Sequence, residues 1–562
     1  MLSIAAFLIP HRKSRIVDEL KLTVKPDDKT FRVPSGTTLL EALIAGEIMV
    51  RSDCGGHGRC GKCTVRFPAG RGSSLSKPDD EEIKLVGPER ISSGFRLACR
   101  VTVSGDVTVE IPQKSRVTPD VVKKGLPAIL SGLHSTGTAR SGPISYGIAA
   151  DIGTTTLAVY LCSMEEGTII GSTSLRNPQA IFGDDVISRI SAVTTDPVTL
   201  PRLRKMVVRA IDWAVKALCA PMRISPSAVI GMTAVGNPTM IHLLLGEDPS
   251  SIGVYPFSPL FTEDRFLKAG DIGLRFNPEA TLRTLPLISG YLGADIVSAA
   301  LAADLLDAPD GVMLIDVGTN GEIIYRSKNE LIATSCATGP AFEGATIRHG
   351  MQAASGAIDS FYFDSRENRF KYTTIQHDPT NPKSPSGLCG SGVISTVAEL
   401  VRTGVITKSG SFNTSLEFPQ LRTGNGEAME FEIVSGEEAQ DGKPITLTQN
   451  DVRAVQLAKA AMRAGIELLC RQCGVETPIC IKLAGAFGSY INKRDALSIG
   501  MFPPLPEDLI EVVGNAAGAG AVLALTDHRR FLKSLEISRS TKVFDLASHP
   551  EFQETFIGFL SF

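Results

Sequence analysis

The stretch Cys54-Gly-Gly-His-Gly-Arg-Cys60-Gly-Lys-Cys63 decides the fold of the N-terminal part, and a fourth cysteine, Cys99, follows after 35 intervening residues. Four thiolates with this spacing can hold a [2Fe–2S] cluster, three from one loop and one from a distant element. Glycine permits the positive-φ turns that a loop around a cluster requires. Zinc sites, the main alternative, usually come as paired C-x2-4-C knuckles, and the second pair is missing here. The four cysteines are therefore predicted to be iron–sulfur ligands.

The sequence on either side of the cysteine loop predicts a small β-rich domain. Residues 18–34 alternate apolar and polar side chains over two short runs, which indicates a β-hairpin. Thr37–Ala45 is typical of a helix that Thr38 can cap, and Thr64–Phe67 is typical of a strand. In this order the elements resemble a β-grasp [2Fe–2S] ferredoxin over residues 18–112, and the first cysteine spacing is similar to the adrenodoxin-like branch.

The whole chain is too long for a ferredoxin alone, because 562 residues suggest three or four domains. A net charge of −3 without a basic stripe argues against nucleic acid as a partner. The seven remaining cysteines are scattered and odd in number, which favours a reducing cytoplasm over a disulfide framework. The apolar run Leu2–Ile9 is too short to span a membrane. Residues 113–145 are rich in Pro, Ser, Gly and Thr and are expected to form a linker.

The body of the chain contains one acidic hairpin pattern twice. Asp151-Ile-Gly153-Thr154-Thr155-Thr156 follows an apolar strand, and Asp316-Val-Gly318-Thr319-Asn320-Gly321-Glu322 repeats the arrangement 165 residues later. A strand-end Asp can hold Mg²⁺ or its water, while Gly and Thr supply N–H and O–H groups to phosphate oxygens. Either motif alone is equally compatible with an ordinary tight turn. The repeat predicts two hairpins that face each other and clamp a nucleotide.

A third glycine turn, Gly485-Ala486-Phe487-Gly488, follows a predicted strand and is suited to a close approach of the backbone to a nucleoside. The chain contains no Walker A motif, which disfavours a P-loop ATPase. The order of the three motifs resembles the actin-like ATPase superfamily, in which two RNase H-like lobes enclose a cleft. Other glycine-dense stretches expected near the same cleft are 236–240, 289–295, 338–344 and 387–392.

The combination of ferredoxin, linker and actin-like body resembles the reductive activators of corrinoid enzymes over roughly residues 18–530. The resemblance implies a β-grasp ferredoxin and a two-lobed RNase H-like (ASKHA) body. It divides the chain into a ferredoxin at 18–112, a linker at 113–145, a middle region at 146–225 and a C-terminal ATPase-like domain at 226–562. It also implies ATP-dependent transfer of one electron from the [2Fe–2S] cluster to the Co(II) of a corrinoid protein, which restores Co(I). The implied partners are that corrinoid protein, a low-potential electron donor and a second copy of the chain.

The predicted roles of the site residues follow from these motifs. Mg²⁺ or its water shell is assigned to Asp151 and Asp316, and Glu322 and Glu343 are the candidates for the hydrolytic base. The expected nucleotide-binding residues are Gly153, Thr154, Thr155, Thr156, Gly318, Thr319, Asn320, Gly321, Gly485, Ala486, Phe487 and Gly488. The expected cluster ligands are Cys54, Cys60, Cys63 and Cys99.

Two other functions fit the same residues. The protein could inject electrons into a different low-potential enzyme, in a manner similar to the activators of 2-hydroxyacyl-CoA dehydratases, and the acceptor would then not be cobalt. It could also be a non-catalytic redox-sensing scaffold, and in that case it would not bind nucleotide.

Overall fold

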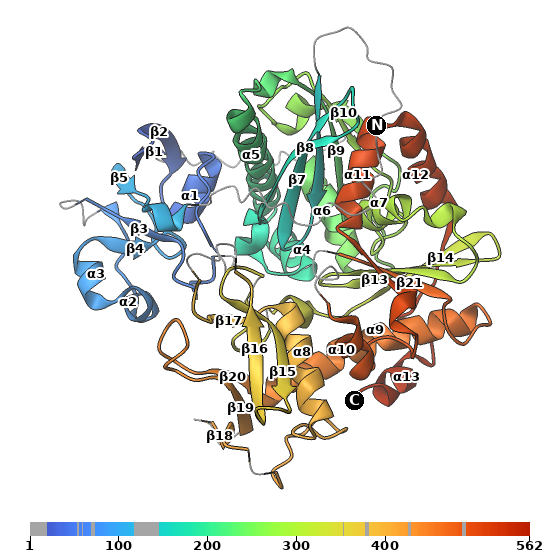
Figure 1. Ribbon diagram of the computed structural model, residues 1–562. Helices are drawn as coiled ribbons and strands as arrows, with labels where there is room; N and C mark the ends of the chain where they lie inside the picture. Colours follow the sequence, from blue (N-terminus) through green and yellow to red (C-terminus); the bar gives the residue numbers. More distant parts are fainter. Residues whose placement is uncertain are drawn as a thin grey trace, which may run out of the picture. The chain divides into compact units, whose positions relative to one another are not determined.

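The computed structural model describes residues 19–52, 56–58, 60–68, 74–116, 145–344, 346–351, 353–376, 382–416, 418–424, 429–485 and 491–562. The chain divides into two compact units, residues 1–118 and residues 119–562 (Figure 1). The segment Leu2–Ile9 and most of the linker expected at 113–145 lie outside the described residues.

The first unit is a five-stranded mixed sheet in the order β2-β1-β5-β3-β4. The predicted hairpin is confirmed, because β1 and β2 pair antiparallel with Leu22 opposite Phe31. Strand β1 pairs parallel with β5, and Thr38 caps the predicted helix α1, as expected for a β-grasp fold. The elements are β1 (Glu19–Lys25), β2 (Lys29–Pro34), α1 (Leu39–Ala45), β3 (Thr64–Arg66), α2 (Asp80–Val86), α3 (Pro88–Ser92), β4 (Phe95–Leu97) and β5 (Val107–Glu110).

The second unit contains two large sheets with the same core topology. The first sheet has the order β10-β11-β9-β6-β7-β8, and the second has the order β22-β21-β12-β13-β14-β23. In the first, β6, β7 and β8 are antiparallel neighbours while β9 and β11 continue parallel to β6. In the second, β12, β13 and β14 are antiparallel neighbours while β21 and β22 continue parallel to β12. The predicted pair of RNase H-like lobes is thus present.

The strands of the first sheet are β6 (Tyr146–Ile152), β7 (Thr156–Ser163), β8 (Ile169–Arg176), β9 (Val229–Gly236), β10 (Phe266–Lys268) and β11 (Thr281–Thr284). Those of the second are β12 (Val312–Val317), β13 (Gly321–Ser327), β14 (Glu330–Cys336), β21 (Cys480–Ala484), β22 (Ile510–Gly514) and β23 (Thr541–Val543).

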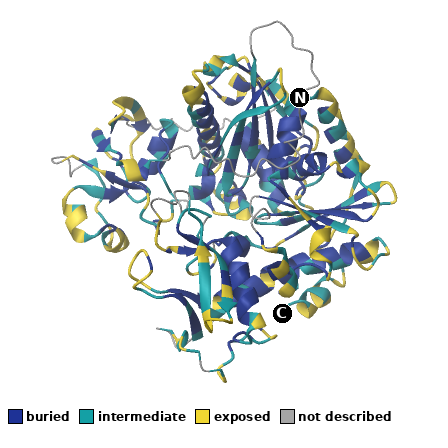
Figure 2. Ribbon diagram, viewed as in Figure 1, coloured by how far each residue is buried: buried dark blue, intermediate teal, exposed yellow. Residues whose placement is uncertain are grey.

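Two helices fill the space between the sheets. Helix α7 (Ala294–Ala302) packs against α11 (Ala516–Thr526), α11 covers β6 and β9, and α7 also contacts β12. Small side chains allow this close packing, because a Cβ on Gly520 would lie 1.9 Å from the carbonyl oxygen of Ser298. One buried apolar cluster includes Ala149 of the first sheet and Leu314 of the second. Figure 2 shows buried residues along both sheets and on these helices.

The remaining helices surround the sheets or belong to an insertion. They are α4 (Val186–Thr195), α5 (Thr199–Cys219), α6 (Pro238–Leu245), α8 (Gly390–Arg402), α9 (Gln449–Gln472), α10 (Lys493–Ser498), α12 (His528–Ser540) and α13 (Phe552–Gly558). None of the helices within the described ranges is long and apolar enough to cross a membrane.

The division expected between residues 225 and 226 falls inside the first sheet. Strand β9 follows this point and pairs parallel with β6 from Tyr146 to Ile152. A boundary there would separate two hydrogen-bonded neighbours. The second sheet begins only at β12, whose first residue is Val312.

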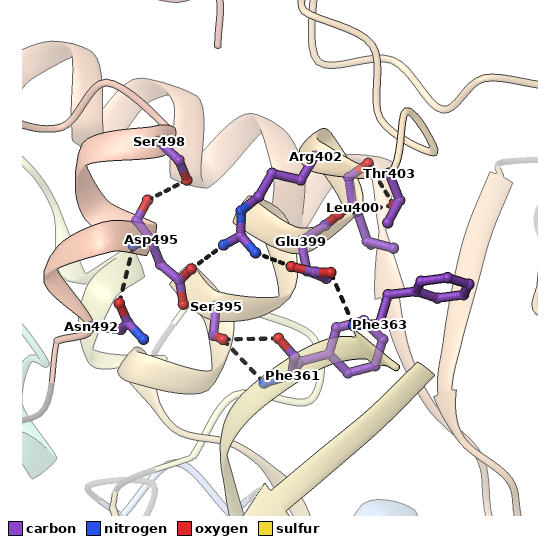
Figure 3. Close-up of polar contacts among 10 residues, drawn as sticks. All are labelled: Phe361, Phe363, Ser395, Glu399, Leu400, Arg402, Thr403, Asn492, Asp495 and Ser498. Atoms are coloured by element: carbon purple, nitrogen blue, oxygen red, sulfur yellow. Dashed lines mark hydrogen bonds and ion pairs between the residues drawn. The ribbon is translucent and has the colours of Figure 1, made fainter. Parts of the chain in front are cut away.

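An insertion between β14 and α9 forms two three-stranded sheets and α8. The sheets have the orders β16-β15-β17 and β18-β19-β20. Figure 3 shows how α8 is fixed: Arg402 pairs with Glu399 of its own helix and with Asp495 of α10. Glu399 also accepts a 2.9 Å hydrogen bond from the Phe363 N–H of β15. The strands are β15 (Ala357–Asp364), β16 (Arg369–Thr374), β17 (Gly387–Leu388), β18 (Leu421–Thr423), β19 (Met429–Val434) and β20 (Ile445–Thr448).

Candidate functional site

Two of the predicted cluster ligands lie side by side in the first unit. The sulfur atoms of Cys63 and Cys99 are 3.3 Å apart. Sheet pairing causes this approach, because Cys63 precedes β3, Cys99 follows β4, and Thr64 lies opposite Leu97 in these strands. Cys60 is partly exposed, and Cys54 lies outside the described residues.

The glycines of the cysteine loop have the predicted backbone conformation. Gly58 and Gly61 have φ angles of +68° and +67°, which residues with a side chain rarely adopt. A Cβ on Gly58 would lie 2.0 Å from Nε of Arg100, so a side chain at this position would displace the guanidinium. Arg100 is in turn bound to Asp79 at 2.6 Å and to Glu81. A glycine-shaped loop that ends at Cys63, with the Cys99 thiol beside it, fits a [2Fe–2S] cluster.

The backbone next to Cys99 is held by a buried ion pair that the sequence did not indicate. Arg96 donates to both carboxylate oxygens of Glu82, at 3.0 and 2.8 Å. The same carboxylate accepts a 2.6 Å hydrogen bond from the Leu97 N–H. A further bond of 3.0 Å joins the Ala98 N–H to the Cys63 carbonyl. These contacts fix the segment that carries the fourth ligand.

In the second unit, Asp151 lies at the end of β6, where the predicted first hairpin turns. Asn515, which caps α11, donates a 3.0 Å hydrogen bond to this carboxylate and another of 3.0 Å to the Tyr160 hydroxyl. Burial raises the pKa of Asp151 to about 6, and the hydrogen bond from Asn515 opposes that increase.

Three polar side chains, of which Asn177 and Arg189 are buried, hold the backbone and side chain of the first turn in place. Asn177 donates to the Gly153 carbonyl at 2.8 Å, and Asn237 donates to the Thr154 hydroxyl at 2.9 Å. Arg189 of α4 is fully buried and donates to the Thr154 carbonyl at 2.5 Å. Among the described residues no carboxylate forms an ion pair with Arg189, so a buried cation lies directly behind the turn. Asn177 and Arg189 were not predicted, and the sequence placed Asn237 only in a glycine-dense stretch expected near the cleft.

The second hairpin brings two predicted carboxylates opposite each other. Asp316 of β12 and Glu322 of β13 are direct antiparallel partners. Like charges in this position destabilise a sheet. Burial, followed by the negative charges of Asp295 and Asp151, raises the pKa of Asp316 to about 8. Burial and the neighbouring Asp295, Asp316 and Glu343 also raise the pKa of Glu322.

Asp295 joins this acidic group, although the sequence placed it only in a glycine-dense stretch. It lies in the first turn of α7, and burial together with the charge of Asp151 raises its pKa to about 7. No lysine, arginine or histidine in the described ranges forms an ion pair with Asp151, Asp295, Asp316 or Glu322.

Glu343 connects the two hairpins. It ends the short 3-10 helix η10 (Pro340–Glu343), and its two carboxylate oxygens accept hydrogen bonds from two hydroxyls. The Thr155 hydroxyl donates at 2.8 Å and the Thr319 hydroxyl also donates at 2.8 Å. The predicted facing of the two hairpins is confirmed, because one carboxylate reaches both.

The other predicted residues occupy more varied positions. Gly485 follows β21, and a Cβ there would lie 2.7 Å from a carboxylate oxygen of Asp316. Gly321 is packed in the core, where a Cβ would meet Met462 at 2.3 Å. Thr156 begins β7, and Gly318 and Asn320 form the second turn, closed by a 3.0 Å bond from the Gly318 N–H to the Asn320 carbonyl. Ala486, Phe487 and Gly488 lie outside the described residues.

The arrangement combines an acidic group with two turns that offer N–H and O–H groups. Within the described residues, no three His, Cys, Asp or Glu side chains are grouped closely enough to hold a metal ion. Mg²⁺ usually keeps several waters and binds through one or two carboxylates plus substrate phosphates. The donor set therefore fits Mg²⁺ that enters together with a nucleotide.

Three protein-family models match consecutive parts of the chain. The 2Fe-2S iron–sulfur cluster binding domain matches residues 22–104, and the RACo middle region matches residues 146–308. The C-terminal domain of RACo, the ASKHA domain, matches residues 310–562.

Comparisons with individual proteins agree with this assignment. The corrinoid activation enzyme RamQ of Eubacterium limosum is 34% identical over 420 residues, covering 73% of this chain and 69% of the relative. The [Co(II) methylated amine-specific corrinoid protein] reductase of Methanosarcina barkeri is 25% identical over 424 residues, covering 70% and 72%. The solved structure of a reductive activator for corrinoid, iron-sulfur protein matches with a TM-score of 0.69 and 29% identity, over 97% of this chain and 98% of that one. This chain belongs to the family of reductive activators of corrinoid proteins.

Proposed function

We propose that this protein uses ATP to drive the transfer of one electron from a [2Fe–2S] cluster to the Co(II) of a corrinoid protein, which yields Co(I). The observation that carries the proposal is the presence, in one chain, of a cluster-binding unit and an acidic two-hairpin site. The redox unit supplies the electron, and the second unit supplies the energy. ATP is hydrolysed to ADP and phosphate, and no phosphoryl group is transferred to cobalt.

The cluster would be held by Cys54, Cys60, Cys63 and Cys99 and would act as a one-electron carrier. The adjacent sulfurs of Cys63 and Cys99 support this ligand set. Glu82 and Arg96 would keep the fourth ligand in position through their bonds to the neighbouring backbone.

The nucleotide phosphates would bind between the two hairpins. Thr154, Thr155, Thr319 and Asn320 would face phosphate oxygens, and Gly485 would lie beside the nucleoside. Asp151 and Asp316 would hold Mg²⁺ through its waters, since hard oxygen ligands suit this ion. The acidic group, which has no cationic partner among the described residues, supports the assignment of a divalent ion here.

Energy coupling is required because reduction of Co(II) by the [2Fe–2S] cluster is thermodynamically unfavourable. A [2Fe–2S] centre of this kind has a potential near roughly −400 mV, and the Co(II)/Co(I) couple of corrinoids is lower still. For one electron, each tenfold bias corresponds to about 59 mV. A bias of about 10⁴-fold, or about 5.5 kcal/mol, is therefore needed to shift the equilibrium by about 240 mV. Differential binding linked to ATP can supply a bias of this size.

The direct test is anaerobic absorption spectroscopy with a Co(II) corrinoid protein, the full chain and a low-potential reductant, with and without Mg-ATP. ATP-dependent appearance of the Co(I) band supports the proposal. Cluster reduction without any cobalt change, across several corrinoid proteins, would contradict it and would favour another electron acceptor. Failure of the protein to bind nucleotide would favour a redox-sensing scaffold.

A change at one cluster ligand tests the redox unit separately. Cys63→Ala should abolish the visible absorption and the reduced-state EPR signal of the [2Fe–2S] cluster, because one iron loses a thiolate. Cys473→Ala is the matched control, since this partly exposed cysteine lies in the other unit. Iron-free, zinc-loaded wild-type protein would refute the cluster assignment.

The proposal extends to a cytoplasmic homodimer that receives electrons from a separate low-potential donor. The seven cysteines outside the cluster motif are free thiols, which supports a reducing compartment. Analytical ultracentrifugation at micromolar concentration would test the dimer, and a monomeric mass would refute it.

A further inference from the structure

Glu343 occupies the position between the two hairpins that the proposed function gives to a phosphate. Its two oxygens accept from Thr155 and Thr319 at 2.8 Å each. The hydroxyls come from β6–β7 and β12–β13, two different sheets. A phosphoryl group also presents several anionic oxygens close together, so it would satisfy the same two donors.

Glu343 lies near another carboxyl group and has no cationic partner among the described residues, which is unusual for a carboxylate held in a fixed position. No lysine, arginine or histidine among the described residues forms an ion pair with it. Glu322 lies close enough for the charge of Glu343 to raise its pKa. The two hydroxyl donors are therefore the contacts that hold Glu343 in place, and a bound phosphate would compete for both of them.

We propose that Glu343 is a placeholder for phosphate, which nucleotide must displace to reach Thr155 and Thr319. The inference rests on the proposed nucleotide site and deepens it. Glu343 is then a positioning residue that joins the hairpins in the ligand-free protein. Its negative charge opposes nucleotide binding, and its displacement reports that binding to the rest of the chain.

The segment that carries Glu343 is connected to the insertion. The Thr338 hydroxyl donates to the Thr319 carbonyl at 3.2 Å, so the start of this segment is attached to the second hairpin by a hydrogen bond. At its other end the Met351 N–H donates to the Leu388 carbonyl at 2.8 Å, and the Leu388 N–H donates to the His349 carbonyl at 2.8 Å. Strand β17, which contains Leu388, leads directly into α8. Movement of Glu343 would therefore reach the N-terminus of α8 through backbone hydrogen bonds.

The experiment measures nucleotide affinity rather than turnover. Calorimetry with the cluster-loaded full chain, Mg²⁺ and adenylyl imidodiphosphate gives Kd without hydrolysis. Glu343→Gln removes the charge and keeps the shape, and hydrogen bonds to a charged acceptor are about twice as strong as neutral ones. The variant should bind the analogue about tenfold more tightly than wild type, within the range usual for coupled sites. Glu330→Gln is the matched control and should leave Kd unchanged, because Glu330 is a partly exposed residue of β14 that pairs with Lys542.

Hydrogen exchange of the wild type keeps the inference testable if the variant does not fold. Peptides containing residues 339–344 should exchange faster with the analogue than without it. In Glu343→Gln the same peptides should exchange fast in both conditions.

The outcomes separate this inference from the proposed function. Tighter binding by Glu343→Gln supports the placeholder, whereas unchanged or weaker binding would overturn it. Loss of ATP hydrolysis in a separate assay of that variant would then assign Glu343 to catalysis. Unaltered exchange at residues 339–344 on binding would also overturn it. If neither protein binds the analogue, the proposed function itself fails, and this inference fails with it.

Discussion

The two acidic hairpins share one topology, but their polar surroundings are opposite. Asp151 in the first hairpin lies across from Ala158 and accepts a hydrogen bond from Asn515. Asp316 in the second lies across from Glu322, and no donor among the described residues reaches its carboxylate. The first turn is backed by a buried arginine, whereas the second is held by contacts to residues 338–343.

This difference indicates that the two hairpins have different roles in ligand binding. The first is held by hydrogen bonds from asparagine side chains and from the buried Arg189, so it is a rigid platform before any ligand binds. The second carries buried carboxyl groups whose pKa values are raised, and a divalent ion would take the place of the protons that they hold. Binding energy is therefore available mainly at the second hairpin, and conformational change is expected there.

The largest effect is expected from removing each hairpin aspartate in turn. Asp316→Ala should leave the cluster spectrum intact and reduce ATP-stimulated cobalt reduction by about 10²-fold, the usual cost of one lost electrostatic contact in a catalytic site. It should also raise the thermal unfolding midpoint of the ligand-free protein, because it removes a carboxyl group that is buried opposite Glu322 without a hydrogen-bond donor among the described residues. Asp151→Ala should reduce activity but lower that midpoint, because Asn515 loses its acceptor. Calorimetric melting curves and cobalt-reduction assays of both variants distinguish the two aspartates. Equal shifts of the unfolding midpoint would show that the two hairpins do not differ as described.

A smaller effect is expected from the buried arginine, which has no counterpart in the second hairpin. Arg189→Met should cost about 3 kcal/mol, because the Thr154 and Gly183 carbonyls lose a charged donor. Nucleotide affinity should fall about tenfold, since the first turn loses its support. Arg189→Lys is the control: it keeps the charge but not the planar fork, so it should recover part of the affinity. Full recovery by lysine would mean that charge alone matters.

Site residues close together in the sequence could be predicted, whereas those far along the chain from the turns that they contact could not. Each hairpin was recognisable because strand, aspartate and glycine turn lie within ten residues, and the repeat gave the two-lobed fold. Asp295, Asn515 and Arg189 come from helices far from the turns they serve, and nothing local distinguishes Arg189 from an exposed arginine on an amphipathic helix. For the same reason the boundary at residue 225 could not be corrected from sequence, because the pairing of β9 with β6 is a long-range contact.

In the cluster unit, local pattern was more informative. The cysteine spacing predicted the ligand set, and the glycines of the short cysteine loop predicted the positive-φ turns that the structure shows at Gly58 and Gly61. The Glu82–Arg96 pair was missed because glutamate and arginine are common on surfaces, and only the folded sheet buries this pair.

The pH dependence of stability should differ between the hairpins. Burial raises the pKa of Asp316 from 3.8 to about 8, so the folded state keeps a proton that the unfolded chain releases. Stability of the ligand-free protein should therefore fall as pH rises from about 4 to about 8. In Asp316→Asn this dependence should be weaker between pH 6 and 8, whereas Asp151→Asn should change it mainly below pH 6, since the pKa of Asp151 is about 6. Melting curves at constant ionic strength measure this, and identical pH profiles for the two variants would refute the assignment.

The smallest effect is expected from the two hydroxyls that bind Glu343. Thr155→Val and Thr319→Val each remove one hydroxyl donor and keep the shape of the side chain. Each should weaken binding of the nucleotide analogue only about threefold. The loss is small because the phosphate loses a hydrogen bond but no longer has to displace Glu343 from that hydroxyl. The first hairpin is fixed by Asn177, Asn237 and Arg189, and hydrogen exchange near residue 155 should remain unchanged in Thr155→Val. The second hairpin lacks such support, so Thr319→Val should speed exchange across both residues 318–321 and residues 338–344. Equal exchange in the two variants would show that the hairpins are equally rigid, and the assignment of different roles to them would then be wrong.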